Sequence, residues 1–336
     1  MFTTGRSEGG GSGPRILVVR IGSMGDVIHA LPACATLKHS FPGSTLTWVI
    51  HPKWAQLLEG NPFVDDLIRF DHRKAGSVAD TWRTLRQARY DFAVDFQGLI
   101  QSALVASFAR PDRIFGFHQS QVREKLAALF YSSRVRAAAV HVVDRNLELA
   151  AAAGASTILL KFPLPDGIPE GDLPAGGFVL SNPQAGWGAK QWPLEYYGVL
   201  ARRLRDELGV PLVLTGAPGS RSLLASVPGA LVNISGLPGL IHATRCASAV
   251  LGCDSGPTHL AAALGKPGVA VFGPTDPARN GPYGGSFTVL RSPGAVTSHK
   301  RRAAIASSME TISPEQVFEA LKTRLCSEST PAGSGL

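Results

Sequence analysis

The sequence predicts an α/β protein of two doubly wound, Rossmann-like domains that face each other across a cleft. Short apolar runs alternate with helical stretches in both halves of the chain, which is typical of parallel sheets with helices on both faces. A proline- and glycine-rich segment, residues 162–177, separates the two series. The 336 residues also exceed the usual size of one domain, and two units of about 150 residues each fit that length.

In the first half, the pattern predicts four strands with helices between and after them. Residues 15–20, RILVVR, are expected to form a buried strand, and the glycine-containing turn IGSMGD is expected to lead from it into a helix. The next expected elements are strand 45–50, short helix 52–59, strand 67–70, helix 78–89, strand 90–96 and a helix from about residue 99.

The alternation restarts after the proline- and glycine-rich segment. A last helix is predicted over 314–325, because Ser313 is a good N-cap and Pro314 suits the first helical position. The expected elements before it are strands 178–181, 211–215, 231–234, 249–253 and 269–272, with helices 194–207, 220–226, 237–246 and 258–264 between them.

These elements set the expected domain boundaries. The termini, 1–13 and 327–336, lack apolar periodicity and are expected to be disordered tails. Between them we expect a first Rossmann-like domain at 14–165, a linker at 166–177, a second Rossmann-like domain at 178–312 and a C-terminal helix at 313–326.

Composition limits the possible functions. No apolar run approaches the ~20 residues that span a bilayer and no signal core is present, so we expect a cytoplasmic protein. The net charge of +8 favours nucleic acid, anionic lipid headgroups or phosphorylated sugars as partners, with a solvated basic face as the alternative.

The four cysteines are too scattered for a disulfide framework or a zinc site, and we expect buried apolar thiols at Cys34, Cys246, Cys253 and Cys326.

Two turns at the carboxyl ends of strands carry the expected chemistry. The turn DSGPTH, which begins at Asp254, leads into an alanine-rich helix, and free backbone N–H groups at a helix start suit a phosphate. The turn IGSMGD ends in the carboxylate of Asp26, which suits proton transfer. Ligands of open α/β sheets bind at such strand ends, so we expect both turns to face one cleft.

The motifs in these turns and beyond them resemble those of the lipopolysaccharide heptosyltransferases of glycosyltransferase family 9, most of all the heptosyltransferase I group. The resemblance covers nearly all of residues 15–325. It is carried by RIGSMGDVIHALP from Arg20, DFQGL from Asp95, VREKL from Val122, KQWP from Lys190, DSGPTHL from Asp254 and FGPTDP from Phe272.

The resemblance implies GT-B architecture and transfer of heptose from ADP-heptose to an inner-core sugar of lipopolysaccharide, with inversion and without a metal or other cofactor. The first domain would then bind the acceptor and the second the nucleotide-sugar. A Kdo-bearing lipid A acceptor and a peripheral location at the cytoplasmic face of the inner membrane are implied as well, and nucleic acid is not an expected partner.

Two residues are predicted to be catalytic. Inverting transfer needs a base for the acceptor hydroxyl, and Asp26 fits that role, although a first-turn carboxylate also stabilises a helix without any catalytic function. By resemblance, Lys190 lies on the diphosphate side of the cleft and stabilises the leaving group, whereas a lysine after a turn is commonly solvated.

The resemblance also implies ligand contacts on both sides of the cleft. Asp254 would contact heptose hydroxyls, with a plain N-cap as its alternative, and His259 would be a phosphate-side ligand or a packed helical histidine. The predicted donor-binding residues are Gly22, Ser23, Met24, Gly25, Asp254, Ser255, Gly256, Thr258 and His259.

On the acceptor side, the resemblance places Gln97 and Arg123 against the Kdo carboxylates, with a surface arginine as the alternative for Arg123. Gln101 and Lys125 depart from residues found in some heptosyltransferase I enzymes. The stretch GSRS, residues 219–222, lacks the carboxylate that often holds the donor ribose in the family. These departures concern the acceptor and the nucleotide rather than the reaction class.

The absence of three sequence motifs weighs against several other classes of enzyme. The sequence has no Asp-x-Asp triplet, no complete G-x-G-x-x-G fingerprint and no P-loop, which weighs against metal-dependent transferases, dehydrogenases and ATPases. Two alternatives stay open: a family 9 enzyme with another nucleotide-sugar or acceptor, and a protein that binds a nucleotide-sugar without turnover.

Overall fold

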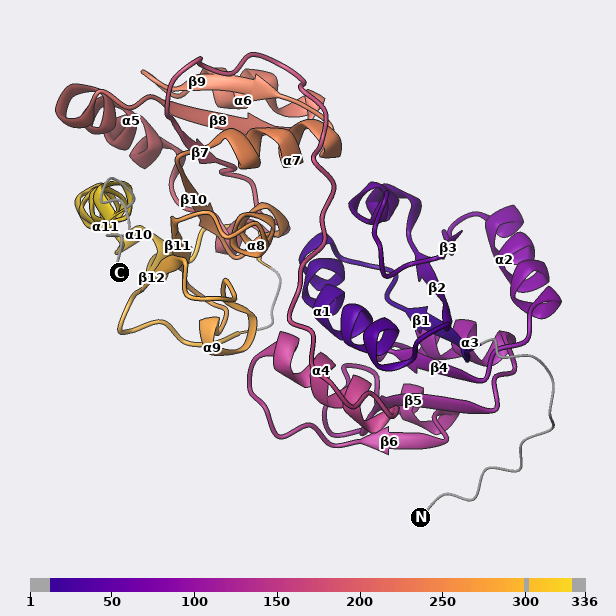
Figure 1. Ribbon diagram of the computed structural model, residues 1–336. Coiled ribbons are helices and arrows are strands. Elements are labelled where there is room, and N and C mark those ends of the chain that lie inside the picture. The colour runs from indigo at the N-terminus through magenta and orange to yellow at the C-terminus, as the bar shows by residue number, and fades with distance from the viewer. Residues whose placement is uncertain (1–12, 299–301, 328–336) are drawn as a thin grey trace, which may run out of the picture.

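The computed structural model describes residues 13–298 and 302–327, so most of the two expected terminal tails lies outside the described residues. Within this part of the chain, each half forms a parallel six-stranded sheet with helices on both faces (Figure 1). The expected fold of two doubly wound domains is therefore confirmed.

The first sheet has the strand order β3-β2-β1-β4-β5-β6. Its strands are β1 (Arg15–Val19), β2 (Thr45–Ile50), β3 (Asp66–Arg69), β4 (Phe92–Asp95), β5 (Arg113–Phe117) and β6 (Ser133–Val135). The helices around it are α1 (Met24–Ser40), α2 (Ala75–Gln87), α3 (Ile100–Phe108), α4 (Val142–Ala152) and the 3₁₀ helices η1 (Pro52–Leu58) and η2 (Lys125–Phe130).

Alternate residues of each buried strand pack against different helices. Ile16 and Val18 of β1 belong to the cluster formed with α1, α4 and η1. Leu17 and Val19 belong to the cluster on the opposite face, formed with α2, α3 and η2. This two-residue period divides the helices of the first domain into an inner layer (α1, α4, η1) and an outer layer (α2, α3, η2).

The second sheet has the strand order β12-β11-β10-β7-β8-β9, which repeats the order of the first when its strands are counted from β7. Its strands are β7 (Val179–Ser181), β8 (Leu212–Gly216), β9 (Leu231–Ile234), β10 (Ala249–Cys253), β11 (Gly268–Phe272) and β12 (Phe287–Arg291). The helices of this half are α5 (Leu194–Leu208), α6 (Arg221–Ala225), α7 (Leu237–Cys246), α8 (Gly256–Ala263), α9 (Pro277–Asn280), α10 (Ser307–Glu310), α11 (Pro314–Ser327), η3 (Gly188–Lys190) and η4 (Pro218–Ser220).

The connection between the two sheets, residues 153–178, contains no helix or strand and is hydrogen-bonded to both domains. Its first part is held by α1, where the Leu159 N–H donates to Thr36 Oγ1 over 2.9 Å. Its second part is held by α7, where Arg245 Nη2 donates to the carbonyl oxygen of Leu164 over 2.8 Å.

The domains also share an apolar core. Leu260 of α8 and Ile241 of α7 are fully buried in the same cluster as the inner layer of the first domain. The carboxyl ends of the two sheets therefore face each other with α1 and α8 in contact between them.

Several elements were missing from the prediction: β5, β6, β12 and α4. β6 and β12 lie at sheet edges and are partly exposed, so they lack a continuous apolar run. β5 contains Gly116, which weakens a strand pattern, and α4 starts after His141 rather than after a common N-cap residue.

The prediction for the cysteines was wrong at two of the four positions. Cys34 and Cys253 are buried, whereas Cys246 and Cys326 are exposed because each lies on the solvent side of a helix, α7 and α11 respectively. None of the helices in the described part of the chain is both long and apolar enough to pass through a membrane.

The shared core gives a prediction about stability. Replacing Leu260 with alanine should lower the free energy of unfolding by about 2–5 kcal/mol, because it leaves a cavity between the domains. Leu223→Ala on α6, where the side chain is 46% exposed, is the matched control and should change it by at most about 0.5 kcal/mol. Denaturant unfolding measures both, and equal losses in the two variants would contradict the shared core.

Candidate functional site

One cavity of about 940 Å³ lies where the carboxyl ends of the two sheets meet. Both domains line it: the β1–α1 turn, η1 and Arg123 from the first, and the segments after β7, β8, β9 and β10 from the second. In each sheet the strand order reverses between the first strand and its neighbour, β4 or β10, and open α/β sheets bind ligands at this point.

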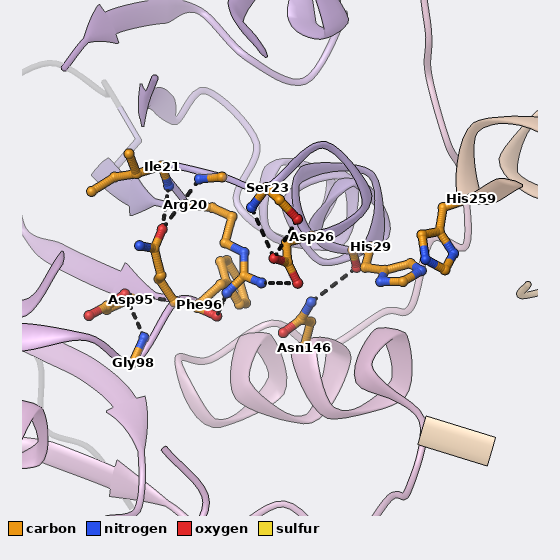
Figure 2. A network of polar contacts seen from close by, with 12 residues as sticks. Arg20, Ile21, Ser23, Asp26, His29, Asp95, Phe96, Gly98, Asn146 and His259 are labelled. Carbon is orange, nitrogen blue, oxygen red and sulfur yellow. Dashed lines mark hydrogen bonds and ion pairs between the residues drawn. The ribbon is translucent and has the colours of Figure 1, made fainter. Parts of the chain in front are cut away.

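The first polar group in the cavity is the carboxylate of Asp26, at the third position of α1. Its Oδ2 atom accepts hydrogen bonds from the Ser23 backbone N–H (2.9 Å) and the Ser23 hydroxyl (3.0 Å). Its Oδ1 atom lies 2.5 Å from Nη2 of Arg20. The Nη1 atom of the same guanidinium donates to the carbonyl oxygen of Phe96 (Figure 2). Asp26 thus does stabilise its helix start, while 40% of its side-chain surface stays exposed.

These contacts keep Asp26 ionised. Burial acts to raise its pKa, but the Arg20 guanidinium and the hydrogen bonds from Ser23 outweigh burial, so the pKa lies below its ordinary value. An ionised carboxylate with exposed surface is able to accept a proton from a ligand in the cavity.

Gln97 fixes the turn that carries Asp26. Its side-chain Oε1 accepts from the backbone N–H groups of Ile21 (2.7 Å) and Gly22 (3.4 Å). Gln97 is held in turn by the buried Asp95, which accepts from its backbone N–H over 2.8 Å. The β4–α3 loop therefore supports the β1–α1 turn.

The second polar group lies at the start of α8. Ser255 is the N-cap residue, so Asp254 is not, and the Asp254 side chain instead forms a buried ion pair with Lys190 of η3. The Lys190 ammonium also lies 4.3 Å from the centre of the Trp187 ring. Asp254 Oδ1 lies 3.5 Å from Nε2 of His259.

Asp254 is also ionised. Burial acts to raise its pKa, but the hydrogen bond from His259 and the charge of Lys190 lower it far more, so the pKa lies well below its ordinary value. The first turn of α8 adds the positive end of a helix dipole and unpaired N–H groups on the same side of the cavity. This arrangement is suited to an anion.

The starts of α1 and α8 are in direct contact, and each contact requires a glycine. A Cβ atom on Gly25 would lie 2.4 Å from Cδ2 of His259, and one on Gly256 would lie 2.6 Å from the sulfur of Met24. Side chains at either position would push the helices apart. The two glycines therefore let Asp26 and Asp254 line the same cavity from different domains.

A group of histidines fills the space behind this contact. The rings of His29 and His259 are 4.4 Å apart between centroids, and His141 lies 5.6 Å from His29. Burial, followed by the proximity of His259 and His141, holds the pKa of His29 well below its ordinary value, so His29 is neutral. His141 ties the domains together by donating from Nε2 to the carbonyl oxygen of Gly281 over 3.1 Å.

The structure brings most of the predicted site residues together. Gly22, Gln97 and Thr258 do not line the cavity, and the Thr258 hydroxyl donates to the carbonyl oxygen of Cys253 over 2.6 Å. The predicted residues that do line it are Ser23, Met24, Gly25, Asp26, Arg123, Lys190, Asp254, Ser255, Gly256 and His259.

Sequence reasoning missed three residues at this site. Arg20 was quoted within a motif without a role, although a charged residue at the end of a buried strand signals a buried partner. His29 follows Asp26 by one helical turn, which places both on the cavity side of α1. Trp187 gave no signal, because its contact with Lys190 depends on the turn before η3.

Comparison with known proteins agrees with this geometry. The sequence model of glycosyltransferase family 9 (heptosyltransferase) matches residues 78–309. Lipopolysaccharide heptosyltransferase 1 of Pseudomonas aeruginosa is 30% identical over 305 residues, which cover 83% of this chain and 84% of that protein. The structure of E. coli heptosyltransferase WaaC with ADP is similar with a TM-score of 0.75 and 27% identity, over 92% of this chain and 99% of that chain.

A second structure, E. coli heptosyltransferase WaaC with ADP-2-deoxy-2-fluoro heptose, has a TM-score of 0.73 and the same 27% identity, over 92% of this chain and 99% of that chain. The matched residues cover more than half of the sequence and include the starts of α7 and α8, which line the cavity from the second domain. The chain belongs to glycosyltransferase family 9, the family of heptosyltransferases.

Proposed function

We propose that this protein transfers heptose from ADP-heptose to a Kdo or other inner-core sugar of lipopolysaccharide, with inversion at the anomeric carbon. The relative named lipopolysaccharide heptosyltransferase 1 and the WaaC structure with ADP-2-deoxy-2-fluoro heptose support this donor and this acceptor class. The observation that carries the proposal is that an exposed carboxylate, Asp26, and an anion-binding helix start, α8, line one cavity from opposite domains.

Asp26 is the proposed general base. As the acceptor oxygen forms its bond to the anomeric carbon, the bond from that carbon to the diphosphate oxygen breaks, and the hydroxyl proton passes to the Asp26 carboxylate. Inversion requires the base and the leaving group to lie on opposite sides of the sugar. Asp26 on α1 and the start of α8 belong to different walls of the cavity, which suits this requirement.

Lys190 and α8 are proposed to stabilise the departing ADP. The Lys190 ammonium lies in the cavity wall, where a diphosphate would add a second anionic partner to the one that Asp254 already provides. The N–H groups of Ser255 and Gly256 at the start of α8 would bind the phosphate oxygens. Asp254 is proposed to accept hydrogen bonds from heptose hydroxyls.

A metal ion is not needed in this proposal. Residues 13–298 and 302–327 contain no group of three or more His, Cys, Asp and Glu side chains placed to hold one. The helix start and Lys190 supply the positive charge that a metal ion supplies in other transferases.

On the acceptor side we propose Arg123, which is exposed and lines the cavity, as the contact for a Kdo carboxylate. Gln97 uses its carbonyl oxygen to hold the β1–α1 turn, so its effect on the acceptor would come through that turn or its amide NH₂ group. Because such an acceptor is attached to lipid A, we place the protein at the cytoplasmic face of the inner membrane.

The first test replaces the base. Wild-type protein with ADP-heptose and a Kdo-lipid A acceptor should give a product one heptose heavier by mass spectrometry, with EDTA present. Asp26→Asn should slow this reaction by roughly 10²–10⁴-fold, because the carboxylate that takes the proton is lost. Calorimetric ADP binding should persist, since Asp26 is on the acceptor side of the sugar.

Asp80→Asn is the matched control, because Asp80 is an exposed carboxylate of α2 paired with Arg83. Its turnover should equal that of the wild type. Preference for UDP or GDP over ADP in calorimetry would favour a family 9 enzyme of other specificity. Tight ADP binding without transfer to any lipid acceptor would favour a binding protein.

The second test uses pH. Since the pKa of Asp26 is held below its ordinary value, the base is ionised throughout pH 5–8 and kcat/KM should show no acid limb from Asp26 in that range. Arg20→Gln removes the charge that lowers the pKa but leaves the burial that raises it, so an acid limb should move upward into the measured range. Arg20→Lys keeps the charge and should shift the limb less. An unchanged profile in Arg20→Gln would show that Arg20 does not tune the base.

A further inference from the structure

The outer layer of the first domain exposes large apolar side chains. Leu126 and Leu129 of η2 are 61% and 65% exposed, and being three residues apart in a 3₁₀ helix they project from the same side. Phe130 beside them, Leu104 on the adjacent α3 and Trp82 on α2 are 37%, 37% and 49% exposed. α3 packs against both η2 and α2, so these side chains come from neighbouring elements of the outer layer.

This surface faces away from the second domain. The inner layer, α1, α4 and η1, contributes to the shared interdomain core, whereas the outer layer packs on the opposite face of the sheet. Figure 1 shows α2 on the side of the first domain remote from α8. The second domain therefore leaves the outer layer uncovered.

The same part of the chain carries most of the net charge. Residues 73–136 contain eleven Lys and Arg against five Asp and Glu, which is six of the formal net charge of +8. Three of the five acidic residues in this range are paired or buried. Asp80 pairs with Arg83, Asp112 pairs with Arg89, and Asp95 is buried. The remaining two, Asp91 and Glu124, accept from the backbone N–H groups of Arg15 and Ile100.

Exposed basic side chains lie on or next to the elements that carry the exposed apolar ones. They are Arg86 on α2, Arg110 after α3 and Lys125 at the start of η2. Protruding apolar groups surrounded by positive charge suit the interface of a bilayer that contains anionic lipids. A protein partner would be better matched by a groove or a continuous apolar area.

One element of this surface, η2, follows a cavity residue closely in the chain. Arg123 lines the cavity, and η2 begins two residues later. The loop between them is fixed, because Val122 packs on Gly98, where a Cβ would lie 2.7 Å from it, and Glu124 accepts from the Ile100 N–H over 2.7 Å. A headgroup at η2 is therefore next to the acceptor side of the cavity.

We propose that the outer layer, with η2 at its centre, docks on the surface of a bilayer containing anionic lipids. Leu126 and Leu129 insert between headgroups, and the basic side chains contact lipid phosphates. The role of this docking, which is to present a lipid-anchored acceptor to the cavity, rests on the proposed function. The docking itself follows from the surface alone.

The experiment is sedimentation of the full chain with phosphatidylcholine vesicles, with and without about 30% phosphatidylglycerol. The wild type should bind the anionic vesicles, release at high salt and bind the neutral vesicles weakly. The double variant Leu126→Gln/Leu129→Gln should lower the bound fraction at least about five-fold. The matched control Ile158→Gln/Ile168→Gln alters two residues of the interdomain connection that are 66% and 59% exposed, and it should bind like the wild type.

Absence of wild-type binding to anionic vesicles would overturn the proposal. So would equal binding by the Leu126→Gln/Leu129→Gln variant, an equal loss in the control, or equal binding to neutral vesicles. Heptose transfer to a detergent-free, water-soluble acceptor separates docking from function. The η2 variant should retain that transfer and lose transfer to a vesicle-embedded acceptor, whereas vesicle binding without any transfer would refute the proposed function alone.

Discussion

The contact between the first turns of α1 and α8 is the constraint on which the site depends. These turns follow β1 and β10, which are central strands of the two sheets and lie where the strand order reverses, so both helices present their N-termini to the space between the domains. Gly25 and Gly256 allow the approach, each facing a side chain of the other helix. Without this contact, the two halves of the cavity would be separate surfaces.

Each domain also supplies the cation that pairs with its own cavity carboxylate. Asp26 pairs with Arg20 in the first domain, and Asp254 pairs with Lys190 in the second. Both carboxylates are therefore ionised although they lie near a domain interface, and neither depends on the opposite domain for a partner. The neutral His29 between them adds no further charge to the interface.

The sequence was sufficient to predict the parts of the site that depend on local pattern. The strand, glycine turn and helix at IGSMGD and at DSGPTH were identified because each is contiguous in the chain, and Asp26 and Asp254 follow from them. Partners far apart in the sequence were not predictable in this way. Gln97 reaches the Ile21 N–H 76 residues away, and the prediction instead placed it against the acceptor.

The same distinction holds for the fold. Central strands such as β1 and β10 are buried on both faces and read as continuous apolar runs. The edge strand β6, at three residues and partly exposed, has no such pattern and is specified by its pairing with β5. The exposure of Cys246 likewise depends on which side of α7 packs, and on composition alone it resembled a buried residue.

The most direct measurement on the assembled cavity is kcat for heptose transfer by Gly25→Ala, where the added methyl group would lie 2.4 Å from Cδ2 of the buried His259. Gly76→Ala on α2, where a Cβ meets nothing within 4 Å, is the control. If the contact of α1 with α8 assembles the site, Gly25→Ala should lower kcat at least about ten-fold while ADP still binds, and Gly76→Ala should not. Wild-type kcat in Gly25→Ala would contradict the account.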